Sequence, residues 1–375
     1  MMFPRKYQKL DKYLEANKSL VIYGPRQVGK TTLIKSYLKQ TNKRYKLDSG
    51  DNIRVRQIIG SEDFSKIVDY VGGYELYVID EAQRIPNVGL GLKIIVDQVP
   101  GITVIVTGSS SFELSGQVGE PLTGRKKALT LFPISQTELT PAVYNKGELK
   151  EKLPEILIFG SYPAVIGASG EKRKQRLEEI VDSYLLRDIL ELEKVKGSKV
   201  LLDLLRLVAF QVGSEVSLSE LGQQVGLDYK TVARYLDLLE KSFVLFNLRG
   251  YSRNLRTEIT KKSKYYFWDN GIRNSIIANY NDLELRDDVG KLWENFLVAE
   301  RLKIQEYQGI HANNYFWRSW EGQEIDWIEE REGKLFGYEF KYSAEKLREP
   351  TGFRRAYQDA TVEIVNKENY LEFVG

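Results

Sequence analysis

One glycine-rich turn constrains the fold of this 375-residue chain more than any other feature. It lies in SLVIYGPRQVGKTTLIKSYLKQ, residues 19–40, where an apolar run precedes it and a helix-forming segment follows it. The turn fits the pattern G-x-x-x-x-G-K-[ST], which binds phosphate when it connects a strand to a helix. Pattern and context together predict an α/β fold with a parallel sheet.

The turn is expected to bind ATP through its backbone and two side chains. Small residues let backbone N–H groups wrap around the phosphates, and the helix N-terminus adds partial positive charge. Lys30 would neutralise the β- and γ-phosphate oxygens, and the Thr31 hydroxyl would ligate Mg²⁺. The predicted cofactor-binding residues are Gly24, Pro25, Arg26, Gln27, Val28, Gly29, Lys30, Thr31 and Thr32. A glycine-containing turn that enters a helix by chance is the alternative interpretation.

A second motif, LYVIDEAQ at residues 76–83, is an apolar run that ends in two acids. Asp80 is expected to hold Mg²⁺ through water, and Glu81 is expected to polarise the attacking water. These roles predict ATP hydrolysis and not only ATP binding. In the alternative interpretation, both acids cap the helix that follows.

Further strands are expected at RYKLD, residues 44–48, and at ITVIVTGSS, residues 102–110. An extra strand between the P-loop strand and the acidic strand is the order found in P-loop ATPases with an adjacent catalytic Glu. The polar end of the later strand, Thr107 to Ser110, would lie near the γ-phosphate as a sensor. Arg125 is a candidate arginine finger or sensor, and an ordinary surface arginine is the alternative.

Composition excludes several classes of protein. The chain has no Cys and a single His, His311, which argues against a disulfide framework, a cysteine nucleophile and a zinc hydrolase. The N-terminal MMFPRKYQKL lacks the apolar run of a secretory signal, and the longest apolar runs are too short to cross a bilayer. We therefore expect a cytoplasmic protein with no membrane partner. A formal charge of +3 does not by itself indicate nucleic acid.

The chain is longer than a usual single domain, and three domains are predicted. A polar stretch at 144–155 marks the first boundary, so the P-loop ATPase domain is assigned to residues 1–150. A helical lid and winged helix-turn-helix are assigned to residues 151–285. An α+β domain of the restriction-endonuclease type is assigned to residues 286–375.

The segment SLSELGQQVGLDYKTVARYLDLLEKSFVLFNL, residues 217–248, predicts a helix-turn-helix. Ser217 with Glu220 forms a capping-box pattern, Gly226 ends the first helix, and Asp228 caps the second. The β-rich FVLFNL that follows is typical of a winged helix.

The next segment, residues 249–266, is basic and contains interleaved tyrosines. Such a hairpin suits the phosphate backbone of DNA. The predicted DNA contacts are Arg249, Arg253, Arg256, Lys261, Lys262 and Lys264. In the alternative interpretation, the module only connects domains and the basic run is a solvated face.

Near the C-terminus, GYEFK at residues 337–341 is predicted to end a strand. Successive side chains of a strand point to opposite faces. Glu339 and Lys341 would therefore share one face, while Tyr338 and Phe340 take the other. The strand either has one face exposed to solvent or contributes half of a metal site.

Upstream residues complete a candidate metal site. Glu294 lies on a helix expected at residues 290–303, and Asp326 lies in the second of three strands expected within residues 315–341. Asp326 and Glu339 would hold a divalent metal with help from Glu294, and Lys341 would orient or activate water for phosphodiester hydrolysis. An acid-rich meander without this chemistry is the alternative.

Nearly the whole chain resembles the prokaryotic AAA-type (AAA+) ATPases that carry a winged helix and a C-terminal domain similar to PD-(D/E)xK nucleases, such as archaeal Holliday-junction resolvases. The matching segments are GPRQVGKTT at 24–32, VIDEAQ at 78–83, LTGR at 122–125, FGSYPAV at 159–165, YYFWDNGIRN at 265–274, LWENFLVAE at 292–300, GQEIDWI at 322–328 and GYEFK. The resemblance places the ATPase roles on Lys30, Thr31, Asp80 and Glu81. It departs from the nuclease motif at Ile325, where the name-giving Pro would stand.

The resemblance also implies a homo-oligomer, because AAA-type sites usually lie between subunits, with Arg125 acting in trans. Two functions stay open. In the first, ATP turnover drives DNA engagement through the winged helix, and the C-terminal domain cuts DNA. In the second, the protein is a nucleotide-dependent switch or scaffold whose nuclease-like domain only binds DNA or a protein partner. A metabolic kinase is disfavoured because the remaining length forms these two modules.

Overall fold

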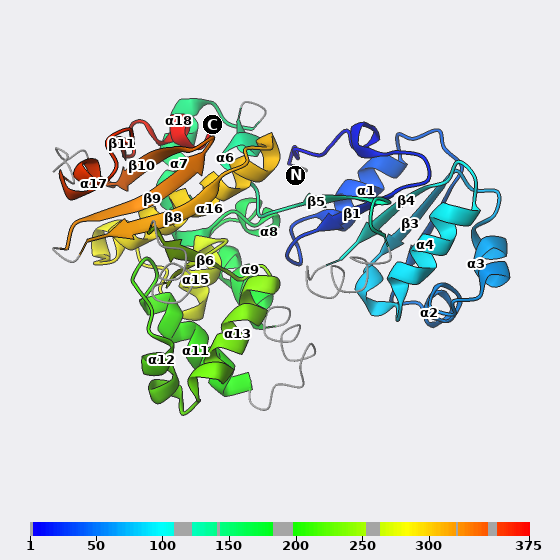
Figure 1. The fold of residues 1–375 in the computed structure, drawn as a ribbon, viewed down its shortest axis with the longest axis horizontal. Coiled ribbons are helices and arrows are strands. Elements are labelled where there is room, and N and C mark those ends of the chain that lie inside the picture. Colours follow the sequence, from blue (N-terminus) through cyan, green and yellow to red (C-terminus); the bar gives the residue numbers. More distant parts are fainter. Residues whose placement is uncertain are drawn as a thin grey trace. The chain divides into compact units, whose positions relative to one another are not determined.

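The computed structural model describes residues 3–108, 122–140, 143–182, 198–252, 263–319, 322–343 and 351–375 (Figure 1). Its chain forms two compact units. The N-terminal unit comprises Arg5–Phe132 and Lys241–Phe243, and the C-terminal unit comprises Met1–Pro4, Pro133–Glu240 and Val244–Gly375. The N-terminal unit thus ends before residue 150, where the sequence placed the first boundary.

A five-stranded parallel sheet forms the centre of the N-terminal unit and confirms the predicted α/β class. The strand order is β2-β3-β4-β1-β5. The strands are β1 (Ser19–Tyr23), β2 (Tyr45–Ser49), β3 (Leu76–Asp80), β4 (Thr103–Thr107) and β5 (Lys126–Thr130). β4 is the predicted extra strand, because it lies between the P-loop strand β1 and the acidic strand β3.

Both faces of this sheet are buried. On one face, side chains such as Val21, Ile79 and Val104 form an apolar cluster with helices α2 (Ile53–Ile59), α3 (Phe64–Val71) and α4 (Val88–Gln98). The intervening strand residues, Leu20 and Ile22 among them, point to the other face and are also buried. Parallel sheets are normally covered on both sides, and α1 (Lys30–Leu38) follows β1 directly.

The C-terminal unit contains most of the helices (Figure 1). They are α6 (Gln136–Leu139), α7 (Lys146–Phe159), α8 (Pro163–Ile166), α9 (Glu171–Ile180), α11 (Ser198–Phe210), α12 (Leu218–Val225), α13 (Tyr229–Lys241), α15 (Asn270–Ile276), α16 (Val289–Gln308), α17 (Thr351–Ala356) and α18 (Tyr370–Phe373). Among the described residues, no helix has both the length and the apolar character needed to cross a membrane.

The predicted helix-turn-helix is formed by α12 and α13. The Ser217 side chain accepts a hydrogen bond from the Glu220 N–H, and Gly226 ends α12 in the left-handed conformation with φ of 70°. The Asp228 carboxylate caps α13 by accepting from the N–H groups of Lys230 and Thr231. The caps at Gly226 and Asp228 and one of the two hydrogen bonds of the Ser217–Glu220 capping box are therefore confirmed, whereas the winged-helix assignment stays a prediction.

A six-stranded mixed sheet runs through the C-terminal unit in the order β11-β10-β9-β8-β6-β7. Its strands are β6 (Leu245–Gly250), β7 (Ser263–Phe267), β8 (Asn313–Arg318), β9 (Glu324–Arg331), β10 (Lys334–Phe340) and β11 (Thr361–Val365). The expected antiparallel meander is present as β8, β9 and β10. The β6–β7 pair joins the same sheet, because β6 pairs with β8 in parallel. The boundary expected at residue 285 therefore falls inside one compact unit.

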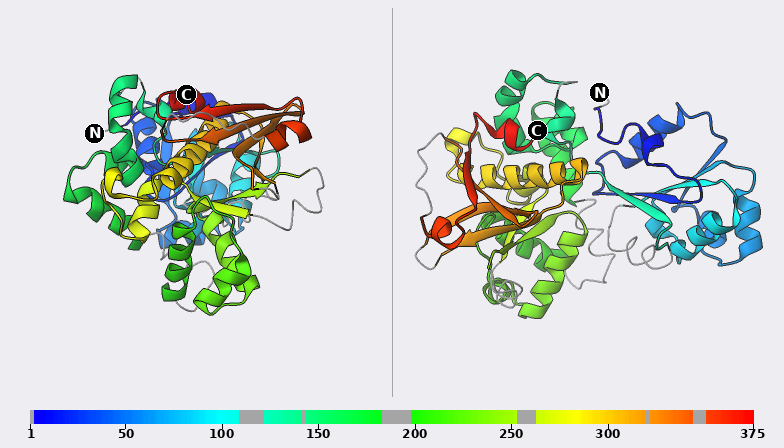
Figure 2. Two further views of the ribbon diagram at one scale, coloured as in Figure 1. Left: turned by 90° about the vertical axis from the view of Figure 1, so that its left-hand side faces the viewer. Right: turned by 45° about the horizontal axis from the view of Figure 1, so that its top comes forward.

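The long helix α16 lies along one face of this sheet and contacts β7 and β10 (Figures 1 and 2). On it, Trp293 is fully buried and lies against the ring of Phe296, with centroids 5.8 Å apart. The helix thus presents its apolar residues to the core, as expected for the region around 290–303.

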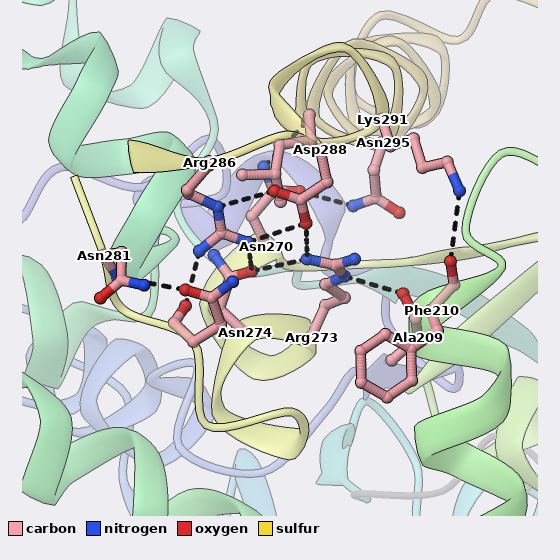
Figure 3. Close-up of polar contacts among 12 residues, drawn as sticks. Ala209, Phe210, Asn270, Arg273, Asn274, Asn281, Arg286, Asp288, Lys291 and Asn295 are labelled. Atoms are coloured by element: carbon pink, nitrogen blue, oxygen red, sulfur yellow. Dashed lines mark hydrogen bonds and ion pairs between the residues drawn. The ribbon is translucent and has the colours of Figure 1, made fainter. Parts of the chain in front are cut away.

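A buried polar network fixes the N-terminal end of α16 (Figure 3). Asp288 lies between Arg273 and Arg286 and accepts hydrogen bonds from both. Arg273 also donates to the Ala209 carbonyl at 2.9 Å, and Asn274 accepts from both arginines. One carboxylate thereby ties the end of α11 and helix α15 to the start of α16.

Candidate nucleotide site and acidic cluster

The predicted P-loop is a tight turn between β1 and α1. Gly24 has φ of 140°, and a Cβ placed there would lie 2.0 Å from the Leu131 carbonyl oxygen. Gly29 has φ of 99°, and Gln27 also has a positive φ of 61°. Only glycine adopts the Gly24 and Gly29 conformations without strain, so the motif glycines are required by the geometry of the turn.

Lys30, the P-loop lysine, is folded back onto its own loop. Its side chain is buried, and Nζ donates to the carbonyl oxygens of Gly24 and Pro25, each at 2.8 Å. A buried ammonium needs acceptors, and these carbonyls stabilise its charge. Phosphate oxygens that enter the loop offer stronger, charged acceptors to the same group.

The two predicted Mg²⁺ ligands lie side by side. Thr31 Oγ1 donates to Asp80 Oδ2 at 2.8 Å, and Thr107 Oγ1 donates to Asp80 Oδ1. They meet because the carboxyl ends of β1, β3 and β4 lie at one edge of a parallel sheet. A hydroxyl and a carboxylate oxygen at this spacing fit Mg²⁺, which takes few protein ligands beside phosphate and water.

Glu81 lies directly after β3 in the left-handed conformation, with φ of 54°. Its N–H donates to Thr107 Oγ1 at 3.1 Å, and its carboxylate accepts from Gln83 Nε2 at 2.7 Å. The side chain makes no capping hydrogen bond to the 3₁₀ helix Ala82–Arg84. The helix-cap interpretation of this acid is therefore not supported. The role of Gln83 was missed in the sequence, although DEAQ contains the residue.

Arg5 is a second residue that the motifs did not indicate. Its guanidinium donates to the Val28 carbonyl inside the P-loop and to the Phe132 carbonyl at 2.6 Å. A single basic residue far upstream of the loop carries no sequence signal for this role. Its contacts nevertheless help to fix the backbone of the nucleotide site.

Arg125 lies at the amino ends of the parallel strands, whereas the P-loop follows the carboxyl end of β1. It therefore cannot contact the nucleotide bound to its own P-loop. Its carbonyl accepts from the Ser19 N–H, so it lies beside the start of β1. The P-loop follows the other end of that strand, about 13 Å away at 3.3 Å per residue. The Arg125 side chain forms an ion pair with Asp97, with Nε 2.6 Å from Oδ1. The prediction that Arg125 acts as a sensor in its own subunit is thus wrong, and only its role in a neighbouring subunit stays a prediction.

Of the predicted sensor segment, Thr107 lies at the site, where it contacts both Asp80 and Glu81. Ser109 and Ser110 lie outside the described residues. The same is true of Arg253, Arg256, Lys261 and Lys262 in the predicted wing. Arg249 is described and is exposed at the end of β6.

The faces expected for GYEFK are confirmed. Tyr338 and Phe340 both pack against the ring of Phe373, with centroids 4.7 Å and 5.5 Å away. Glu339 lies on the other side with Lys341, whose Nζ is 3.4 Å from the Glu339 carboxylate.

The predicted acids of the C-terminal unit form one electrostatic cluster. Burial raises the pKa of Glu294 to about 7, with Lys264 opposing that rise and Asp326 adding to it. Burial and the nearby Asp326 likewise raise the pKa of Glu339 to about 7. Burial would lower the pKa of Lys341, but Asp326 and Glu339 raise it overall. All four residues predicted for the nuclease-like site thus act on one another.

Lys264 was predicted to contact DNA, and the structure corrects this. Its side chain is only 2% exposed, and Nζ lies 2.5 Å from Glu324 Oε1 and 3.3 Å from Glu294 Oε1. A lysine in this position cannot reach a phosphate backbone. The tyrosine-interleaved basic pattern failed here because all of Lys264 to Phe267 in β7 are buried. Glu324 was missed as a member of the cluster.

The acids of this cluster make hydrogen bonds within the chain. Across the described part of the chain, no three Asp, Glu or His side chains are arranged to hold a metal ion. Asp326 Oδ2 accepts from the Phe340 N–H at 2.8 Å, and Glu294 Oε1 accepts from the Tyr266 hydroxyl at 2.5 Å. Ligation of a divalent metal by Asp326 and Glu339 stays a prediction.

Three family models match successive parts of the chain. An AAA domain matches residues 16–140, a domain of unknown function (DUF8612) matches residues 150–283, and another (DUF4143) matches residues 289–371. The AAA match covers the sheet and the P-loop site described above. The N-terminal part of the chain is thus similar to AAA-type P-loop domains, and this similarity supports ATP binding.

Three relatives that match most of the chain are described as uncharacterized proteins. One from Haemophilus influenzae is 27% identical over 303 residues, covering 74% of this chain and 75% of the relative. One from Mycobacterium tuberculosis is 25% identical over 327 residues, covering 86% and 70%. One from Methanocaldococcus jannaschii is 24% identical over 375 residues, covering 93% and 81%.

Two solved structures of RuvB variants from Thermotoga maritima are also similar. Each is 17% identical, with TM-scores of 0.28 and 0.29. The first alignment covers 64% of this chain and 83% of RuvB, and the second covers 68% and 94%. The fold class rests on the strand order given above and not on these alignments.

Proposed function

We propose that the protein is a Mg²⁺-dependent ATPase. The observation that carries this proposal is the hydrogen bond from Thr31 to Asp80 at 2.8 Å, with Glu81 the next residue along the chain. A phosphate-binding loop, a hydroxyl–carboxylate pair and an adjacent acid are the parts that ATP hydrolysis needs. The match to an AAA domain at residues 16–140 supports the same function.

Each group has a distinct task in the proposed reaction. Lys30 exchanges the carbonyls of Gly24 and Pro25 for phosphate oxygens and neutralises charge on the transferred group. Thr31 and Asp80 would hold Mg²⁺, which supplies further neutralisation of the phosphates when bound. Glu81 accepts the proton of the attacking water.

Gln83 restrains the proposed base. Its amide donates to one Glu81 carboxylate oxygen at 2.7 Å and so holds the side chain in this orientation, and turning the carboxylate toward another position breaks this bond. Thr107 fixes the Glu81 backbone and Asp80 together. In this proposal, Lys30, Thr31 and Asp80 bind ATP and Mg²⁺, and Glu81 at the same end of the sheet acts in hydrolysis.

The test is Mg²⁺-dependent ATP turnover of the purified chain, with Glu81→Gln and Lys30→Ala as variants. We expect Glu81→Gln to bind ATP and to lose turnover, and Lys30→Ala to lose both. Turnover that persists in Glu81→Gln would remove this acid as the base. Adding duplex and branched DNA to the same assay tests whether DNA raises the Glu81-dependent rate.

For the C-terminal unit we propose a binding role, in which ATP turnover switches its engagement of DNA or a protein partner. Exposed basic residues of the helix-turn-helix, Lys230 and Arg234, support DNA as one partner, together with Arg249. Exposed Asp237 on the same helix weakens that surface. DNA that leaves the turnover rate unchanged would favour a protein partner instead.

DNA cleavage is the second candidate for this unit. The convergence of Glu294, Asp326, Glu339 and Lys341 favours it. The pairing of Lys264 with two acids of the cluster weighs against it. We therefore place the switch ahead of the nuclease.

Assembly into a homo-oligomer is part of the proposal, with Arg125 reaching a neighbouring subunit's nucleotide. Arg125 is 43% exposed in its pair with Asp97, so it lies at the surface of its own subunit. Arg125→Ala is expected to lower turnover only at protein concentrations where oligomers form. Unchanged turnover in the oligomer would remove this role.

A further inference from the structure

Lys264 is a buried cation of the C-terminal unit, although its neighbours in the sequence are basic and suggested an exposed side chain. It lies on β7, an edge strand of the mixed sheet, yet its side chain is 2% exposed. Burial of an ammonium is unfavourable unless charged or polar partners surround it. Its partners come from two distant elements, Glu294 on α16 and Glu324 at the start of β9.

The acids around it already have partners within the chain. Glu294 accepts from the Tyr266 hydroxyl as well as from Lys264, and its carboxylate faces Gly213, where a Cβ would lie 2.9 Å from Oε2. Asp326 accepts from the Phe340 N–H. Lys341 lies 3.4 Å from Glu339 on the outer side of the cluster. The cluster is thus bordered by ammonium groups on two sides.

We propose that Lys264 is the permanent counter-ion of Glu294 and Glu324 and replaces the divalent metal that a nuclease of this fold would need at Asp326. A divalent cation would have to enter beside a fixed ammonium and take oxygens that already accept hydrogen bonds. The cluster then joins β7, α16 and β9 and performs no hydrolysis. The inference concerns the C-terminal unit and does not depend on the proposed ATPase.

The experiment is a Mn²⁺ titration of the full-length chain without nucleotide, followed by the electron paramagnetic resonance signal of free Mn²⁺. All proteins carry Asp80→Asn, so that the nucleotide site contributes no bound metal. We expect no stoichiometric Mn²⁺ uptake by this parent protein. Uptake of one Mn²⁺ that Asp326→Asn abolishes would overturn the proposal.

A second part of the experiment replaces Lys264 and is expected to create Mn²⁺ binding. In Lys264→Met the cluster loses its fixed cation, and we expect a gain in Mn²⁺ affinity of about tenfold or more, which Asp326→Asn reverses. Lys264→Arg, which keeps the charge, should show no such gain. A folded Lys264→Met that has the parent's melting temperature and takes up no Mn²⁺ would also overturn the proposal.

A double variant keeps the proposal testable if Lys264→Met does not fold. Lys264→Met with Glu324→Gln removes the cation together with the charge of one of its two carboxylate partners. We expect the double variant to melt at a higher temperature than Lys264→Met, because less negative charge is left without a counter-ion. A double variant that melts at the same or a lower temperature would contradict the counter-ion role.

Discussion

The hydroxyl of Thr31 donates a hydrogen bond to the carboxylate of Asp80 at 2.8 Å, and this contact joins residues 49 positions apart in the sequence. It brings the P-loop and the acidic strand end to one edge of the N-terminal sheet. The proposed ATP hydrolysis requires this proximity, because Thr31 and Asp80 would together hold Mg²⁺.

Substitution of Thr31 tests that contact directly. Thr31→Val keeps the shape of the side chain but removes the hydroxyl, so we expect turnover to fall by about a hundredfold or more and to need higher Mg²⁺ concentrations. Thr31→Ser retains the oxygen and should stay near the wild-type rate. Both are measured as turnover against Mg²⁺ concentration, and equal rates in the two variants would exclude ligation by Thr31.

Gln83 offers a test of the restraint on the proposed base. A hydrogen bond to a charged group contributes about 1.5 kcal/mol or more, equivalent to about tenfold in an equilibrium. We therefore expect Gln83→Ala to raise basal turnover by up to about tenfold at saturating ATP, because Glu81 is released. A rate as low as that of Glu81→Gln would instead show that Gln83 positions the base.

Gly24 is expected to be essential for stability even without nucleotide. In Gly24→Ala the new Cβ would lie 2.0 Å from the Leu131 carbonyl oxygen at φ of 140°, so we expect a loss of about 3 kcal/mol or more in unfolding free energy. Gly101 is a matched control, because it has φ of 77° and open space around it. Gly101→Ala should cost about 1 kcal/mol in urea unfolding. Equal losses would show that the clash at Gly24 is relieved.

Asp288 predicts a defined pH dependence of stability. Burial by itself would raise the pKa of Asp288, but hydrogen bonds and charge from Arg286 and Arg273 outweigh it and lower the pKa. A lowered pKa contributes stability above the unfolded-state value of about 3.9, and that stability is lost as pH falls through the folded-state pKa.

The corresponding variant is Asp288→Asn, measured by urea unfolding at pH 7 and near pH 3.5. At pH 7 it should cost about 3 kcal/mol or more, because two buried arginines lose their anion. At the lower pH its deficit against the wild type should shrink. Asp287→Asn changes the exposed neighbouring acid and should have little effect at either pH. A deficit for Asp288→Asn that stays constant with pH would contradict this account.

Local features of the fold could be predicted from residues close together in the chain. Gly226 ends α12 and Asp228 caps α13 because backbone angles and capping hydrogen bonds involve only a few neighbouring residues. The alternation in GYEFK held for the same reason, since Phe340 and Glu339 must point to opposite faces of β10.

Predictions that depended on distant partners were less successful. Lys264 looked like a DNA contact because basic residues surround it in the sequence, whereas its position is set by Glu294 and Glu324. Arg125 looked like a sensor because it follows the other ATPase motifs, yet β5 begins at the opposite edge from the P-loop. The residues that neighbour Lys264 and Arg125 in the sequence do not indicate where either side chain lies in the fold.

The sequence by itself determined the phosphate-binding turn, the acidic strand end and the α/β class, because each depends on local residue types and their spacing. Tertiary structure alone decided that β6 and β7 join the C-terminal sheet and that Lys264 is enclosed among acids. The physical reason is that burial and charge pairing depend on which remote segments pack together. The same lysine would be a DNA contact on a free hairpin and is a counter-ion inside this sheet.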